Sequence, residues 1–199
     1  MSLSLPRPFD AHLHLRRGLL LEKVLPYSAR DFGCALIMPN TDPPILTAVD
    51  AVAYRAEILA QLPPKSAFQP LMTIKLTDDT TPEIITAAQE AGVVAAKLYP
   101  RGVTTNSADG VSDIAALWEV FVEMEKCGMV LCVHGESPGA FCLDRETEFL
   151  HELNQLAVQF SRLKIVLEHI TTAEAVDLVT KFPDTVAATI TPHHLFLTL

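Results

Sequence analysis

The stretch 129–134 reads MVLCVH, five apolar residues that lead directly into a histidine. A run this short and this uniformly apolar is typical of a parallel strand that is covered on both faces. Six further runs of similar length and composition lie at residues 9–14, 34–38, 71–76, 93–99, 165–169 and 186–190. The sequence therefore predicts seven parallel strands, most of which end in polar or ionisable residues.

Helix-like segments lie between most of these runs, at residues 47–62, 81–92, 112–128, 145–160 and 171–183. The first opens with Thr47-x-x-Asp50, and Thr171-x-x-Glu174 at the start of the last has the spacing of a capping box. Gly128 is a natural left-handed stop for the third. Strands alternating with helices predict an α/β fold in which right-handed crossovers join parallel strands.

A TIM (β/α)₈-type barrel is the architecture that this alternation favours. Such a barrel has eight strands and typically ~250 residues, whereas the 199 residues supply seven strands. We therefore expect one barrel domain over residues 1–199 that is incomplete at its C-terminal end, lacking the eighth strand and the residues after it. The edges of the first and seventh strands would then be unpaired.

Composition excludes several classes of protein. Hydrophobic residues make up 49% of the chain, which argues against intrinsic disorder, and the formal net charge of −9 argues against a nucleic-acid partner. No apolar run approaches the ~18 residues that span a bilayer, and the N-terminal residues do not resemble a secretion signal. The four cysteines form no C-x-x-C pair. We expect a cytoplasmic protein with free thiols and no membrane partner.

Five nitrogen-bearing side chains lie at the ends of four predicted strands: His12, His14, Lys97, His134 and His169. Each alone is more often a satisfied structural residue. In a parallel barrel, however, the carboxyl ends of the strands share one face, and two histidines two residues apart on a strand point the same way. Imidazole suits zinc and similar divalent ions. The pattern predicts a metal centre at that face.

Lys97 is the unusual member of this set, because a protonated ammonium repels a metal ion. Its apolar neighbours predict desolvation, which favours the neutral amine. A neutral amine can react with carbon dioxide to form a carbamate, which can bridge two cations. Without that chemistry, Lys97 would be an ion-pair partner or a cation that binds substrate.

Five segments carry a family resemblance: DAHLHLR at 10–16, MPNT at 38–41, KLYPRGVTTNS at 97–107, VHGE at 133–136 and LEHITT at 167–172. Together and in this order they closely resemble the dihydroorotases of the short, single-function type, in the amidohydrolase superfamily of metal-dependent hydrolases. The resemblance continues through TPHHL at 191–195. It covers essentially the whole chain.

The resemblance implies a binuclear metal centre holding two zinc or similar divalent ions. His12 and His14 would hold one ion, His134 and His169 the other, and carboxylated Lys97 would bridge them. A hydroxide shared by the two ions would attack a cyclic amide. The implied reaction is the reversible cyclisation of N-carbamoyl-L-aspartate to (S)-dihydroorotate in pyrimidine biosynthesis.

The resemblance also implies residues that bind this small-molecule substrate. Arg16 and Asn40 would hold its carboxylate, and Thr104 and Thr105 would contact it from a loop. The competing interpretations are that Arg16 is a surface residue, Asn40 a turn residue, and the threonines ordinary loop residues. Members of the family are commonly dimers, so a homodimer is the expected assembly, although no interface is visible in the sequence.

The chain departs from the family in one respect. The family has a catalytic aspartate at the end of the eighth strand, and no aspartate of this sequence lies at an equivalent position, so we assign no catalytic residue. Loss of a positioned proton-transfer group costs ~10²–10⁴-fold in rate. The 199 residues are therefore expected to be most of a longer enzyme or, as they stand, an impaired one.

Two alternatives remain open on the sequence. One is another cyclic amidohydrolase of the hydantoinase or allantoinase kind, although Arg16 and Asn40 suit a substrate with a free carboxylate. The other is a non-catalytic, metal-binding partner chain whose open barrel is completed by another subunit. His193 and His194, which follow the last predicted strand, are interpreted as structural or as supporting the metal ligands.

Overall fold

Seven parallel strands form a single curled sheet in the computed structural model, which describes residues 4–197. They are β1 (Phe9–Leu13), β2 (Cys34–Ile37), β3 (Gln69–Lys75), β4 (Ala95–Leu98), β5 (Val130–His134), β6 (Ile165–Glu168) and β7 (Val186–Ala188). The strands follow one another in chain order across the sheet. The predicted α/β class and the seven predicted strands are confirmed. The sheet is a half-barrel, in which β1 and β7 are its two edges within the described residues.

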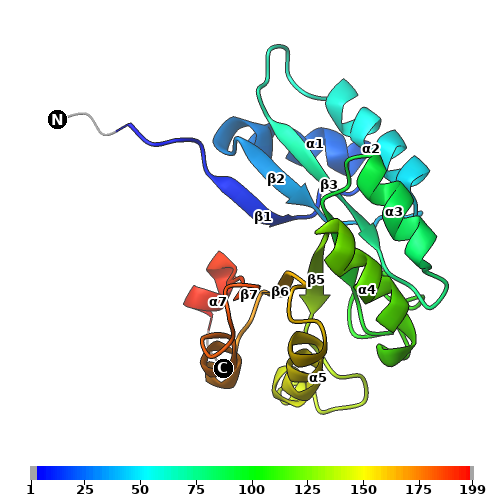
Figure 1. Ribbon diagram of the computed structural model, residues 1–199. Helices are drawn as coiled ribbons and strands as arrows, with labels where there is room; N and C mark the ends of the chain where they lie inside the picture. Colours follow the sequence, from blue (N-terminus) through cyan, green and yellow to red (C-terminus); the bar gives the residue numbers. More distant parts are fainter. Residues whose placement is uncertain (1–3, 198–199) are drawn as a thin grey trace.

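All but the last, short helix cover the outer face of this sheet (Figure 1). The helices are α1 (Gly18–Asp31), α2 (Ala48–Ala60), α3 (Pro82–Glu90), α4 (Trp118–Cys127), preceded by the 3₁₀ turn η1 (Ala115–Leu117), α5 (Arg145–Gln159), α6 (Ala173–Val179) and α7 (Pro192–Phe196). All five predicted helices are present. Within residues 4–197, no helix combines the length and the apolar character needed to cross a bilayer.

Two helical features differ from the sequence-based expectation. The pattern did not predict α1, which has no side-chain cap at its start and contains Pro26, a residue that removes a helical hydrogen bond. It forms because Leu21, Leu25 and Ala29 fall on one buried face. In α6 the cap is Thr172, whose side chain accepts from the backbone N–H of Ala175, and not Thr171.

Alternation along the strands divides the apolar residues between two layers. The larger layer lies between the sheet and its helices, and the smaller, on the inner face, comprises Leu36, Met38, Ala95 and Cys132. Toward the carboxyl ends of the strands this inner face becomes polar, with Lys75, Lys97 and Glu168 all essentially buried. The fold therefore places charged groups inside the half-barrel, beside the predicted histidines.

Candidate active site

Four histidine rings meet at the carboxyl ends of β1, β5 and β6. The ring centroid of His12 lies 4.9 Å from that of His14 and 5.1 Å from that of His169. The His134 and His169 centroids are 4.7 Å apart. Residues separated by more than 150 positions in the chain are thus brought into one cluster, because parallel strands end on the same side of the sheet.

His169 reaches this cluster through an unusual backbone conformation. It directly follows β6 and has a φ of 46°, in the left-handed region that side chains other than glycine rarely adopt. Its backbone N–H donates to Oγ1 of Thr189, 2.9 Å away. Arg16, beyond the end of β1, also has a positive φ, of 60°. Such conformations are often found at functional sites, where the surrounding structure holds them.

Glu168 lies beneath the histidines and was not assigned a role from the sequence. One carboxylate oxygen forms an ion pair with Nζ of Lys97, and the other lies 3.0 Å from Nδ1 of His12. Both the Lys97 and the Glu168 side chains have no exposed surface. A buried ion pair of this kind is retained only where both charges are compensated, and here it links the predicted lysine to the predicted histidines.

Two histidines of the cluster, His14 and His169, are held in their neutral form. Burial, together with the nearby His12 and Arg16, lowers the pKa of His14 to about 3. Burial also lowers the pKa of His169 to about 3, with Lys97 contributing. A neutral imidazole has a free ring nitrogen that can bind a metal.

Burial alone would raise the pKa of the Glu168 carboxyl. The neighbouring Lys97 ammonium and His12 outweigh it and hold that pKa below its usual range. Glu168 is therefore an anion at neutral pH, close to the neutral rings.

The donor atoms fit a divalent ion. Nε2 of His12 and Nε2 of His14 face each other at 3.0 Å, whereas two ligands of one tetrahedral zinc with bonds of ~2.05 Å lie roughly 3.3 Å apart. Ligand atoms of His12, Glu168 and His169 lie within 4.8 Å of one another. Nδ1 of His12 and Oε1 of Glu168 are buried, and each has no polar partner besides the other, 3.0 Å away. This set of nitrogen and carboxylate donors could hold a metal ion.

His134 differs from the other three histidines. Its Nε2 is 2.8 Å from Oε1 of Glu136, with which it forms a hydrogen bond. This contact with His134 lowers the pKa of Glu136 despite partial burial, and Arg145 contributes. His134 would bind a metal through Nε2 only if Glu136 turned away.

A cavity of about 380 Å³ opens above the cluster. Eight of the nine predicted site residues line it, namely His12, His14, Arg16, Asn40, Thr104, Thr105, His134 and His169. Lys97, the ninth, lies below it and is fully buried. His193 and His194, which the sequence predicted to be structural or to support the metal ligands, also line the cavity.

The comparisons with known proteins point in one direction. No protein-family model matches the chain. A curated dihydroorotase of Teredinibacter turnerae is 52% identical over 197 residues, which cover 98% of this chain and 57% of that protein. The chain is homologous to the dihydroorotases. It spans a little over half the length of the curated relatives it matches.

Solved dihydroorotase structures share the fold. The enzyme from Campylobacter jejuni superposes with a TM-score of 0.90 at 42% identity, over 96% of this chain and 56% of that one. The Saccharomyces cerevisiae dihydroorotase, solved in complex with 5-fluoroorotic acid, gives a TM-score of 0.87 at 38% identity, over 96% and 57% of the two chains. The seven-strand half-barrel thus matches a little over half of each of these two enzymes.

The cavity is also lined by polar groups that could hold an anionic ligand. Arg16 donates through Nη1 to the backbone oxygen of Asn40, 3.1 Å away, and a guanidinium has further N–H donors for a ligand. The Asn40 side chain is buried; its Nδ2 donates to the backbone oxygen of Thr105, and its Oδ1 has no hydrogen-bond partner.

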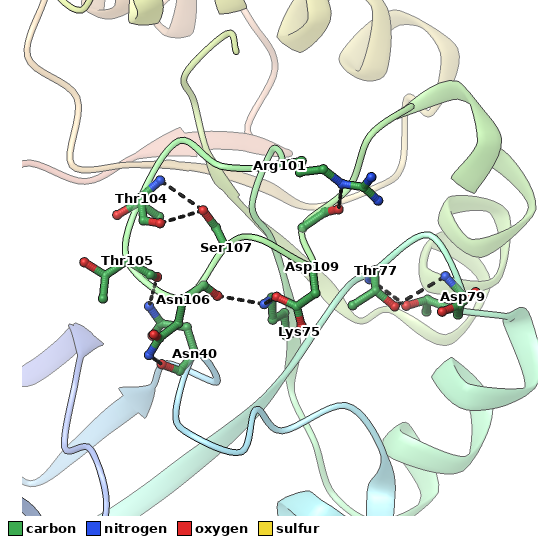
Figure 2. A network of polar contacts seen from close by, with 12 residues as sticks. Asn40, Lys75, Thr77, Asp79, Arg101, Thr104, Thr105, Asn106, Ser107 and Asp109 are labelled. Carbon is green, nitrogen blue, oxygen red and sulfur yellow. Dashed lines mark hydrogen bonds and ion pairs between the residues drawn. The ribbon is translucent and has the colours of Figure 1, made fainter. Parts of the chain in front are cut away.

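The loop after β4 forms the cavity's outer wall. Figure 2 shows Thr104 and Thr105 on this loop, with Asn40 and Lys75 extending toward it from the barrel. Asn106, which has a φ of 55°, donates through Nδ2 to the backbone oxygen of Asn40, 3.0 Å away. Asn40 is therefore tied to the loop by two hydrogen bonds in opposite directions.

Alternation along the strands could have revealed the residues that sequence reasoning missed. Lys75 and Glu168 are charged residues inside or at the end of otherwise apolar runs, on the same face as Lys97. Tyr99, two residues after Lys97, is buried, lines the cavity and has an unpartnered hydroxyl. The two-residue periodicity of side chains along a strand was therefore the signal that could have placed these residues on the inner face.

Proposed function

We propose that this chain carries the metal centre and the substrate-carboxylate site of a dihydroorotase. The reaction is the reversible cyclisation of N-carbamoyl-L-aspartate to (S)-dihydroorotate, a step of pyrimidine synthesis. The observation that supports it most strongly is one cavity lined by four imidazoles together with Arg16 and Asn40, in a chain homologous to dihydroorotases. The protein would act in the cytoplasm, as a homodimer.

The histidines would hold two zinc ions, His12 and His14 one of them, His134 and His169 the other. Lys97 would bridge the two ions as a carbamate formed with carbon dioxide. When bound, such ions supply a nucleophile at neutral pH by lowering the pKa of water and polarise the amide carbonyl. Neutral His14 and His169 are ready for this role, since their pKa values of about 3 leave the rings unprotonated at pH 7.

The substrate carboxylate would bind between Arg16 and Asn40. A guanidinium can make a charge-assisted, two-point contact with a carboxylate, and the free Nδ2–H and hydroxyl donors of Asn40, Thr104 and Thr105 lie around the same cavity. This contact orients the ring so that its amide faces the histidines. A cyclic amide without a carboxylate, such as hydantoin, would lose it.

Hydrolysis also needs a proton for the nitrogen that leaves the ring. In the part of the chain that the structure describes, no aspartate or glutamate lines this cavity. We therefore propose that the described residues supply the metal and ligand contacts of the reaction, and we assign the proton transfer to none of them.

The decisive experiment compares two neighbouring arginines. Arg16→Gln removes the proposed carboxylate contact, whereas Arg17→Gln, the matched control, removes a guanidinium that pairs with Glu57. With zinc-loaded protein, calorimetry should show dihydroorotate binding weakened about ten- to a hundredfold by Arg16→Gln and changed less than threefold by Arg17→Gln. Equal losses in both variants, or hydantoin binding as tightly as dihydroorotate, would overturn the proposed function.

A second measurement addresses the carbamate. Protein loaded with zinc in ¹³C-bicarbonate should give a carbamate carbon signal, and this signal should be absent from Lys97→Met. A signal of equal strength in the variant would show that Lys97 is not the modified residue.

A further inference from the structure

The loop of residues 100–111 is internally well ordered. At its base, the backbone N–H of Arg101 donates to the oxygen of Val111 at 2.9 Å, and the N–H of Val111 donates to the oxygen of Tyr99 at 2.8 Å. Within it, Ser107 exchanges hydrogen bonds with the backbone of Thr104, at 3.0 and 2.6 Å. Because these contacts are internal, the position of the loop over the cavity depends on the groups that tie it to the barrel.

Lys75 is a buried lysine that the proposed function does not use. It ends β3, is 1% exposed and lies opposite Lys97 of β4 in the parallel register. Like charges in such positions destabilise a sheet, so each ammonium needs its own anion. Lys97 has Glu168. Lys75 instead reaches the loop, where it pairs with the Asp109 carboxylate and donates to the backbone oxygen of Asn106 at 2.8 Å.

We propose that Lys75 is a positioning residue that fastens the 100–111 loop to the barrel. If the loop lifted, Lys75 would lose Asp109 and Asn106 together, and its ammonium would stay inside the half-barrel beside Lys97 without a counter-charge. Leaving a buried charge unpaired is strongly unfavourable. The lysine therefore holds Thr104 and Thr105 at the cavity wall (Figure 2). Only the effect on substrate rests on the proposed function; the attachment itself does not.

The other ion pair of the loop differs in burial and provides the control. Arg101 pairs with Asp78, with side chains that are 52% and 36% exposed. Exposed pairs contribute little because water and salt screen them. Arg101→Met and Lys75→Met thus each remove the cation of one ion pair that joins this loop to the rest of the chain. Only Lys75→Met removes a buried cation.

Lys75→Met should leave the fold intact, because methionine fills a similar volume and the released Asp109 is half exposed. Hydrogen–deuterium exchange of the metal-free chain should show amides of residues 101–110 exchanging roughly tenfold faster or more than in the parent. Peptides from α4 and β5 should be unchanged, and Arg101→Met should accelerate the loop less than threefold. Loop exchange in Lys75→Met that is within twofold of the parent, or equal to that of Arg101→Met, overturns the proposal.

Variants of Asp109 test the same contact from the loop. Asp109→Ala should accelerate loop exchange, Asp109→Glu should restore protection, and the Lys75→Met/Asp109→Ala double variant should exchange no faster than the faster single variant. A purely structural role for Lys75 predicts neither the rescue nor this lack of additivity. Additive acceleration in the double variant would refute the pairing.

Substrate measurements then show whether the attachment matters to the proposed reaction. Where zinc-loaded protein turns over, Lys75→Met should raise KM for dihydroorotate several-fold with kcat within about twofold, because the loop contacts substrate without moving a proton. Loop exchange tests the attachment without substrate, and the arginine pair tests the proposed function without altering the loop. The attachment of the loop by Lys75 and the proposed function can therefore be refuted independently of each other.

Discussion

Breaking the Lys97–Glu168 pair tests the most buried electrostatic contact of the site. Neither side chain has any exposed surface, so Lys97→Met leaves a carboxylate in the interior with only His12 beside it. Removing one partner of a buried pair costs about 3–5 kcal/mol. For a chain of this length, ~1 kcal/mol shifts Tm by roughly 2–4 °C, so Tm should fall by roughly 6–20 °C.

The double variant separates the pair from its surroundings. Lys97→Met with Glu168→Gln removes both charges, and replacing a whole buried pair is often neutral. It should therefore be more stable than Lys97→Met alone, by about 2 kcal/mol or more. Urea unfolding followed by circular dichroism, in EDTA so that no ion replaces the lysine, measures the parent, the single variants Lys97→Met and Glu168→Gln, and the double variant. Additive losses, or a loss below ~1 kcal/mol in Lys97→Met, would refute the reasoning.

Three further outcomes follow from the structure. The pKa values of His14 and His169 are about 3 in the folded chain, against ~6.5 when unfolded, so unfolding takes up protons below pH 6.5. The full contribution of these two rings to the stability of the metal-free protein is present above that pH. The free energy of unfolding should therefore fall by up to about 2 kcal/mol per ring between pH 7 and 5. Urea titrations at each pH would measure this fall, and a free energy of unfolding that does not change with pH would contradict the prediction. Zinc at about 100 Kd should stabilise the chain by ~2.7 kcal/mol, a gain that scanning calorimetry should find reversed by EDTA. Gly110→Ala would place a Cβ 2.5 Å from the backbone oxygen of Tyr99, so exchange in the 100–111 loop should accelerate, whereas Ala108→Gly, at an exposed loop position, should have little effect.

The central strands could be predicted closely because each is a short, mostly apolar run, and burial on both faces leaves little choice of residue. The helices were less uniform. The Thr47–Asp50 spacing predicted α2, where both hydrogen bonds of a capping box form. No such local signal marks α1, whose stability comes from burying one apolar face against the sheet. The free energy gained by this tertiary packing outweighs the cost of the proline inside α1, which on local helix propensity alone would argue against a helix.

The site could be predicted as a set of residues but not as a network. Strand ends identified the histidines and Lys97, since parallel topology alone brings them together. Which anion lies beside Lys97 depends on the inner face, where Glu168 is directly opposite His134 in the register of β5 and β6. A single sequence does not give that register before the sheet is built, so Glu168 remained an unassigned neighbour of His169.

His169 shows why strict alternation would have misled as well as helped. Adjacent strand residues point to opposite faces, so Glu168 on the inner face would send His169 outward, toward the helices. The positive φ at His169 breaks the alternation just beyond β6 and turns the ring back to within 5.1 Å of His12, centroid to centroid. One strained residue thus allows two neighbouring side chains to serve the same centre. Its conformational cost of ~1–3 kcal/mol is offset by the contacts that hold it, among them the Thr189 hydrogen bond.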